Sequence, residues 1–238
     1  MRLLTVKLLA LCLSAALVGC AKFPDEGAPG DTKRLVFTLE FEGEVSDFYL
    51  YHVVIFPSPE LNPTDQGPVP VIGPPWGNGF VAGNVRYFIR WTPTQSPQFI
   101  IYRFEGDDLI NFREVGVPIN FVIVPPNDPQ NPNQVERRFL RFEIDLDQIA
   151  ETPAEADAYR SLLVNVISVE NLGGGTQQRA WDALGNSALP SGVNQWVRIP
   201  LNLSRTFRNQ DFAGLEPRGD VADPALDLID WAIEVRLR

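Results

Sequence analysis

Apolar residues recur at every second position in several separate stretches of this chain, and this period limits the folds that it can adopt. Over residues 35–41 every odd position is apolar, and Thr38 and Glu40 lie between them. The same period returns over residues 139–146 and 231–237. Successive side chains of a β-strand point to opposite faces, so the pattern predicts strands with one face in a core and the other in water.

Turn-forming residues separate these stretches from others that favour strands. The chain contains 21 Pro and 18 Gly, distributed as loops between short strands require. Further strands are predicted over residues 48–56, 84–91, 98–104, 119–124, 162–170 and 195–201. Residues 48–56 are apolar on both faces, which predicts a central strand buried on both sides. Residues 84–91 and 98–104 predict a hairpin.

One segment has a complete start signal for a helix. Thr152 can cap the helix, Pro153 suits its first position and Glu155 can close a capping box, which predicts a short helix over 153–161. With the strands, this predicts a mainly β fold, namely a single β-sandwich-like domain over 34–238 with long Pro/Gly/Asn loops and one short helix.

The first 20 residues have a different character. Arg2 and Lys7 precede an apolar run over 8–18. This run is shorter than the roughly 20 residues that a helix needs to cross a bilayer. It therefore predicts a secretory signal peptide and not a membrane span.

The four residues Leu17-Val18-Gly19-Cys20 match the lipobox pattern, and the chain thereby resembles the precursors of bacterial lipoproteins. The resemblance covers these 20 residues and implies cleavage before Cys20, a diacylglyceryl thioether on its sulfur and acylation, such as with palmitate, of the new amino group. Two or three acyl chains hold a protein stably at a membrane. An ordinary secretory signal with a coincidental cysteine is the alternative.

Three segments follow from this resemblance: a signal peptide over 1–19, the lipidated Cys20 with a flexible Pro/Gly tether over 20–33, and the β-sandwich domain over 34–238. The other cysteine, Cys12, would leave with the signal peptide, so no thiol remains for a disulfide, a zinc site or a nucleophile. Ala21 stands where an Asp would favour the inner membrane under the enterobacterial sorting rule. The outer membrane is therefore favoured if the host is Gram-negative.

The charge balance disfavours some partners. The formal net charge of the chain is −10 at pH 7, and Arg2 and Lys7 would be lost with the signal peptide. Nucleic acids and anionic lipid surfaces bind clustered Lys and Arg, so we expect no nucleic-acid partner.

The sequence offers little for catalysis. The only histidine, His52, lies in the most apolar predicted strand, and no Gly-x-Ser-x-Gly motif is present. A packed, hydrogen-bonded histidine is the expectation and a catalytic one the alternative. One histidine also excludes the common zinc sites, so we expect no metal, no cofactor and no enzyme.

Carboxylates leave two alternatives open. Asp107 with Asp108, or Asp145 with Asp147, are candidate glycosidase pairs, which must lie about 5 to 9.5 Å apart across a cleft. The segment 62–67 has the oxygen ligands and glycine of a calcium turn but lacks an acidic residue at the twelfth position. A plain turn is therefore expected there.

The segment over 71–83 contains four Gly, two Pro and two large aromatic residues. It resembles segments of β-rich bacterial envelope proteins of unassigned function, which implies no activity. We expect Trp76, Asn78 and Phe80 to lie on a loop at the end of the sandwich and to contribute to a ligand or partner site, because an indole beside an amide can stack on a sugar. The alternative is that the two aromatic rings plug the core.

The sequence thus predicts a lipid-anchored protein of the cell envelope with a non-catalytic binding or structural role. Its expected partners are the membrane, through the lipid on Cys20, and an envelope protein or a glycan. The alternative is a carbohydrate-binding or carbohydrate-active domain that uses surface aromatic residues and carboxylates.

Overall fold

The computed structural model describes residues 33–131, 133–171, 179–189, 192 and 194–237. The predicted signal peptide, Cys20 and the tether up to residue 32 lie outside these residues. The first strand, β1 (Arg34–Phe41), begins where the sequence predicts the folded domain to start.

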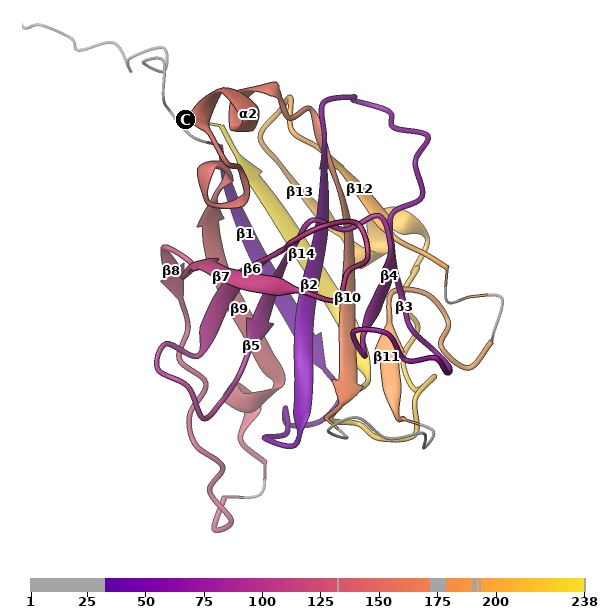
Figure 1. Cartoon of the computed structure of the whole chain (residues 1–238). Coiled ribbons are helices and arrows are strands. Elements are labelled where there is room, and N and C mark those ends of the chain that lie inside the picture. Colours follow the sequence, from indigo (N-terminus) through magenta and orange to yellow (C-terminus); the bar gives the residue numbers. More distant parts are fainter. Residues whose placement is uncertain (1–32, 132, 172–178, 190–191, 193, 238) are drawn as a thin grey trace, which may run out of the picture. The chain divides into compact units, whose positions relative to one another are not determined.

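The fold is mainly β, as predicted, and its strands form two large antiparallel sheets and one small one (Figure 1). The five-stranded sheet has the order β13 (Arg205–Arg208), β14 (Leu228–Arg236), β1, β9 (Phe139–Asp145) and β8 (Asn120–Phe121). The seven-stranded sheet has the order β11 (Trp181–Ala183), β10 (Ser161–Glu170), β2 (Tyr49–Ser58), β5 (Tyr87–Trp91), β6 (Phe99–Phe104) and β7 (Phe112–Gly116), with β12 (Val197–Pro200) also paired to β10. The small sheet pairs β3 (Pro68–Pro70) with β4 (Val81–Gly83). Among the described residues there are four short helical elements: η1 (Val135–Arg138), η2 (Leu146–Ile149), α2 (Pro153–Ala158) and η3 (Asn209–Phe212).

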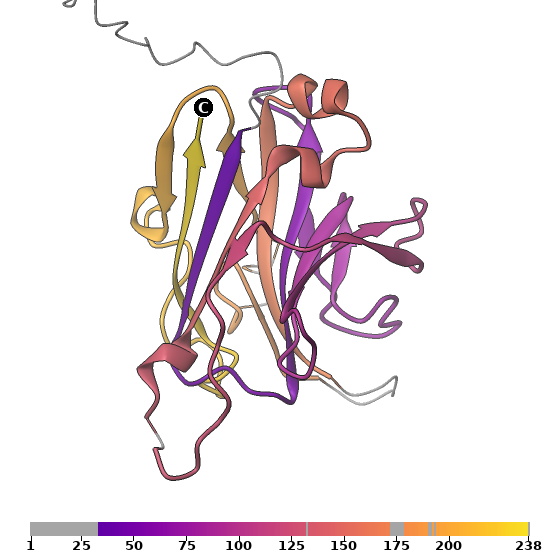
Figure 2. The same cartoon turned by 90° about the vertical axis from the view of Figure 1, so that its left-hand side faces the viewer.

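The two large sheets pack face to face, and their facing side chains form the main core (Figure 2). The odd-numbered residues of β1 are buried in this core, which confirms the predicted alternation. The even-numbered residues over 140–146 are buried in the same core. Each large apolar side chain removed from water in this way contributes about 1.5–3 kcal/mol to folding.

Strand β2 lies between β10 and β5 and is buried on both faces over residues 51–55, as predicted, whereas Phe48 lies outside the strand and is 81% exposed. Tyr51 and Val53 point into the main core, whereas Val54 belongs to a second, smaller apolar cluster on the outer face. Phe80 and Val81, from the β3–β4 segment, cover that second cluster. The outer face of the seven-stranded sheet is therefore a partly closed interior and not a solvated surface.

The predicted hairpin and helix are both present. Strands β5 and β6 pair antiparallel over the expected residues. In α2, Thr152 Oγ1 accepts a hydrogen bond from the Glu155 backbone N–H at 3.2 Å, as expected of a cap. The helix ends at Ala158, before the predicted residue 161, because Arg160 N already donates to Ser58 O at 2.8 Å, beside the start of β10. None of the helices in the described part of the chain is long and apolar enough to cross a membrane.

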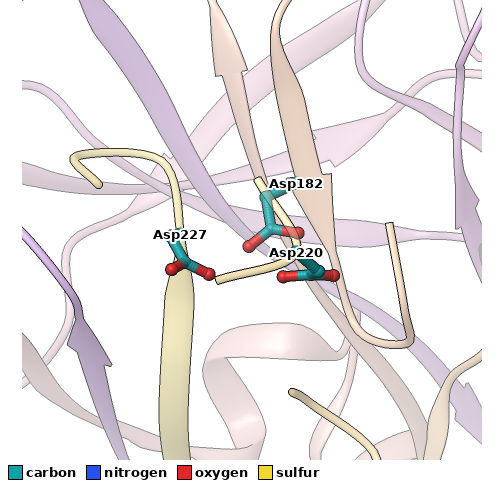
Figure 3. Close-up of side chains that lie close together, drawn as sticks. All are labelled: Asp182, Asp220 and Asp227. Carbon is teal, nitrogen blue, oxygen red and sulfur yellow. The ribbon is translucent and has the colours of Figure 1, made fainter. Parts of the chain in front are cut away.

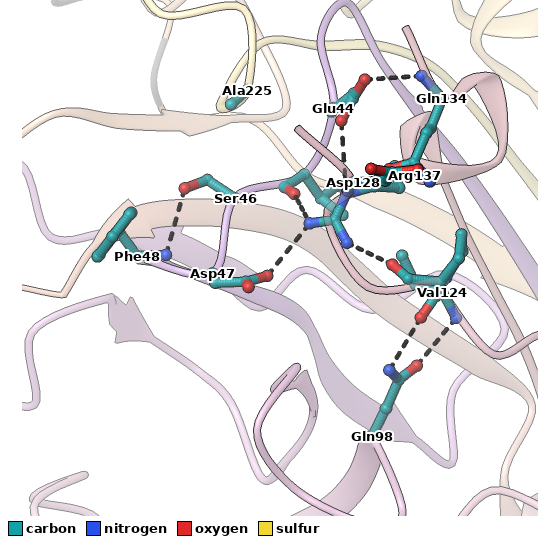
Figure 4. Close-up of polar contacts among 12 residues, drawn as sticks. Glu44, Ser46, Asp47, Phe48, Gln98, Val124, Asp128, Gln134, Arg137 and Ala225 are labelled. Carbon is teal, nitrogen blue, oxygen red and sulfur yellow. Dashed lines mark hydrogen bonds and ion pairs between the residues drawn. The ribbon is translucent and has the colours of Figure 1, made fainter. Parts of the chain in front are cut away.

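A buried arginine fixes the long loop before β9 (Figure 4). The Arg137 side chain donates to Val45 O at 2.7 Å and to Asp47 Oδ1 at 3.1 Å, and it also contacts Pro125 O. A second ion pair joins its Nε to Glu44 Oε2 at 3.5 Å. Arg137 thus connects the β1–β2 turn to the loop and satisfies backbone carbonyls that would otherwise be buried without partners.

Replacing Arg137 by Met should lower the free energy of unfolding by about 3 kcal/mol, because the apolar stem is kept while two backbone carbonyls and the partly exposed carboxylates of Glu44 and Asp47 lose their donor. Urea unfolding of the two proteins measures this difference. Arg113→Met is the control, since the Arg113 side chain is 55% exposed, and it should change stability by less than about 0.5 kcal/mol. Equal effects of the two substitutions would contradict the anchoring role.

Candidate functional site

The segment that connects β3 to β4 lies against the outer face of the seven-stranded sheet. The sequence places Trp76, Asn78 and Phe80 at the end of the sandwich, and the structure corrects this position. The physical reason is Phe80, whose apolar ring packs on residues of β2 and β5 in the middle of the sheet.

Asn78 holds the turn of this segment. Its Nδ2 donates to Val81 O at 2.8 Å and to Leu109 O at 3.0 Å. Its Oδ1 accepts from the backbone N–H groups of Phe80 and Val81 at 3.0 and 2.9 Å. Both amide protons and both acceptor positions are therefore used within the protein, so Asn78 shapes the loop and has no free group for a sugar hydroxyl.

The conformation of the turn requires glycine at position 79. Gly79 has a φ of +93°, and a Cβ built there would lie 2.6 Å from Arg179 Nη1. Because this side chain is missing, the Arg179 guanidinium reaches the loop and donates to Gly79 O at 3.0 Å.

The two aromatic rings of the loop have different surroundings. Phe80 is 3% exposed and stacks on His52 with a centroid distance of 4.1 Å and an interplanar angle of 9°. Trp76 is half-buried, and the Arg179 Cζ lies 5.2 Å from the centroid of its ring. Phe80 therefore acts as a cover for the outer cluster, while one face of the Trp76 indole is occupied by a guanidinium.

Beneath this loop, Arg90 of β5 lies among aromatic rings. Its Cζ is 5.2–5.8 Å from the ring centroids of Phe80, Phe88, Tyr102 and Phe112. Its Nε donates to His52 Nε2 at 3.0 Å. Cation–π attraction stabilises a guanidinium in such a position.

His52 is packed and hydrogen-bonded, as expected from its strand. It is 1% exposed, and burial together with the charge of Arg90 holds the pKa of His52 well below its usual range. The ring is neutral at physiological pH, and because Nε2 accepts from Arg90 the proton resides on Nδ1.

Arg90 and Arg179 both line a hollow of about 230 Å³ beside the loop, hereafter the arginine hollow. Asn78, Gly79 and Phe80 also line it. Within the described ranges, neither arginine forms an ion pair with a carboxylate. Glu170 lines the hollow as well, and its Oε2 accepts from Ala180 N at 3.3 Å, so the hollow presents more positive than negative charge.

Larger hollows elsewhere have a different character. One of about 590 Å³ includes Arg218, which already pairs with Glu42 at 3.1 Å. Another of about 440 Å³ includes Arg103, which pairs with Glu151 at 2.7 Å. Arg208 of the 590 Å³ hollow forms no ion pair with a described carboxylate, but Glu40 and Asp230 line the same hollow. We therefore regard the arginine hollow as the candidate functional site despite its smaller volume.

The carboxylate pairs considered from the sequence are not arranged as facing pairs in a cleft. Asp145 is bound by Arg34 at 3.1 Å, and Asp147 lies exposed on the rim of the 440 Å³ hollow. Asp107 and Asp108 are both exposed on the turn between β6 and β7.

The sequence identifies two lining residues of the arginine hollow, Asn78 and Phe80, but misses both arginines. Arg90 carries a usable signal, because it is the single charged residue of the strand Tyr87–Trp91. A charge within an otherwise apolar strand calls for a nearby partner or function. Arg179 has no such signal, since it lies in a short polar stretch.

No protein-family model matches this chain, and no curated protein sequence or solved structure matches it significantly. The functional inference therefore depends on the residues of the chain itself.

Replacing Phe80 by Ala should lower the free energy of unfolding by about 3–4 kcal/mol, the usual loss for a buried large aromatic residue. Trp76→Ala should cost only about 1–2 kcal/mol, because the indole is half-buried and loses mainly its contact with Arg179. Chemical unfolding of both variants measures the difference. A loss for Trp76→Ala as large as that for Phe80→Ala would contradict this assignment.

Proposed function

We propose that this chain is a lipid-anchored protein of the bacterial cell envelope that acts by binding and not by catalysis, and that its ligand carries an anionic group held between Arg90 and Arg179. The observation that carries the proposal is a hollow lined by two arginines and one carboxylate, Glu170, in which neither arginine forms an ion pair with a described carboxylate. The lipobox ending at Cys20 supports the anchor.

Comparison with other arginines of the domain strengthens the inference. Arg34, Arg86 and Arg137 each pair with a carboxylate oxygen, at 2.9, 2.5 and 3.1 Å. This is the usual way in which a partly buried charge offsets its desolvation. Arg90 contacts aromatic rings and a neutral histidine and forms no ion pair with any described carboxylate, so an anionic ligand would complete its coordination.

The chemistry of the guanidinium defines the ligand class. A planar fork of N–H donors matches carboxylate, sulfate and phosphate groups, often through two parallel hydrogen bonds. A hollow of about 230 Å³ admits one such group with its immediate neighbours, so a larger ligand, such as an acidic glycan, would extend over the surrounding surface. Stacking of a neutral sugar has less support, because Phe80 is buried and Arg179 covers one face of Trp76.

Calorimetric titration of the full chain with acidic and neutral polysaccharides tests the binding proposal. Polygalacturonate and dextran sulfate should bind, in a salt-dependent manner, whereas dextran should not. Arg90→Gln and Arg179→Gln should each weaken binding at least about tenfold, since a charge-assisted hydrogen bond contributes about 1.5–3 kcal/mol.

Arg113→Gln is the matched control, because it removes the same charge from an exposed position on β7. It should leave the Kd nearly unchanged. Equal binding of dextran would favour the neutral-sugar alternative, and full binding by both hollow variants would refute the proposed site. Circular dichroism verifies that the Arg90 variant is folded, and Arg179, which lies outside the strands, provides an independent test.

The anchor is tested by metabolic labelling with a palmitate analogue. Cys20→Ala should abolish the label and leave an uncleaved precursor or a soluble protein, because the thioether cannot form. Cys12→Ala is the control and should retain the label, since this residue precedes the cleavage site. Labelling that persists in the Cys20→Ala protein would show that the cysteine is not the lipid acceptor.

A further inference from the structure

Three aspartates from separate segments meet where the two large sheets are joined (Figure 3). Asp182 lies on β11, Asp227 immediately precedes β14, and Asp220 lies in the loop between η3 and β14. One oxygen of each lies within 4.8 Å of the others. Figure 3 shows the three side chains directed toward a common space.

Backbone and hydroxyl groups hold these carboxylates in place. Asp182 Oδ2 accepts from Leu228 N at 2.8 Å, which links the two sheets, and Asp182 Oδ1 accepts from Ser187 Oγ at 2.7 Å. Asp220 Oδ2 accepts from Ser187 N at 2.5 Å. Asp227 Oδ2 accepts from Gly219 N at 2.9 Å. Each side chain is therefore oriented by at least one protein donor.

The remaining carboxylate oxygens in this region have no partner. Asp227 is 1% exposed, and its Oδ1 has no hydrogen-bond donor among the described residues. Asp220 Oδ1 is likewise buried and without a donor in that part of the chain. Glu216 is 3% exposed, and its Oε1 is a third such oxygen. Oxygens that are buried without donors call for a water, a proton or a cation beside them.

No positively charged side chain of the described residues neutralises these carboxyl groups. Within the residues that the structure describes, Asp182, Asp220, Asp227 and Glu216 form no ion pair. Elsewhere in the domain a buried carboxylate is neutralised, as Glu143 is by Arg34 at 2.9 Å and Arg236 at 3.5 Å. Carboxylates that share a low-dielectric space repel one another strongly, so this group requires either bound protons or a cation.

We infer that Asp182, Asp220 and Asp227 form a calcium site that fastens the loop before β14 to β11, with the Glu216 carboxyl group beside it. The donors are all oxygens, the type that Ca²⁺ prefers, and nitrogen or sulfur ligands of a zinc or copper site are missing from the group. Ligands on opposite sides of a Ca²⁺ ion lie about 4.6–5.2 Å apart, so the present separation of the three oxygens fits one coordination sphere. Water and backbone carbonyls would complete the six to eight oxygens.

Thermal unfolding of the full chain, solubilised in a non-ionic detergent, tests the site. The Tm should be higher in 1 mM CaCl₂ than in EGTA, by about 5–10 °C if this concentration is 100 times the Kd. Titration calorimetry with CaCl₂ should show one binding event. Magnesium should stabilise less, because it demands a smaller octahedral shell and releases water reluctantly.

Asp220→Asn and Asp227→Asn should weaken calcium binding at least tenfold and remove most of the Tm shift. Asp107→Asn removes the same charge from an exposed turn and should keep the full shift. A Tm that is equal in calcium and EGTA, a shift retained by both site variants, or equal stabilisation by magnesium would overturn the calcium assignment. If a variant does not fold, calorimetry on the unmodified protein tests the site. The absence of a heat of binding up to 5 mM CaCl₂ would also overturn the calcium assignment, because even weak extracellular calcium sites bind at about this concentration.

Discussion

The rest of this structure depends on the burial of β2 on both faces. One face completes the core between the sheets, and the other, which includes His52 and Val54, would be an exposed apolar strip if nothing covered it. The β3–β4 segment supplies that cover through Phe80. The arginine hollow lies at the edge of the β3–β4 segment. The segment that covers the apolar strip therefore also partly encloses Arg90.

The two proposed sites have opposite charge, but in both of them ionisable side chains are removed from water without an oppositely charged partner in the described residues. In the arginine hollow, positive side chains are desolvated beside aromatic rings and lack carboxylate partners within the described part of the chain. In the aspartate group, burial and neighbouring carboxylates raise the pKa of Asp182 to about 7 and that of Asp227 to about 6. The domain pairs most of its other buried charges internally, as the contacts of Arg137 illustrate. Buried charges without partners are therefore the exception here, and they mark positions where an external ion or group would lower the free energy.

Local patterns in the sequence predict the fold class well but not the sites. Residues 35–41 and the cap at Thr152 carry their signals within one strand or one helical turn, and both are confirmed. Strands β3, β4 and β11 have three residues each and are too short to show a period. Asp182 and Leu228 are 46 residues apart, so their contact has no local signature. The role of Asn78 could have been recognised, because an Asn whose Oδ1 accepts from the backbone two residues later is a common turn motif.

Trypsin-like proteases must take an arginine side chain into a pocket of their own before they cut the chain. The surface loop before β9 ends in the pair Arg137-Arg138, which would normally invite such an attack. Because the Arg137 side chain is 2% exposed and bound to Val45 O, a protease can take hold of it only after this loop opens. The rate of cleavage after Arg137 would consequently report the local opening free energy of the loop, and burial of this side chain protects the bond although the loop lies on the surface.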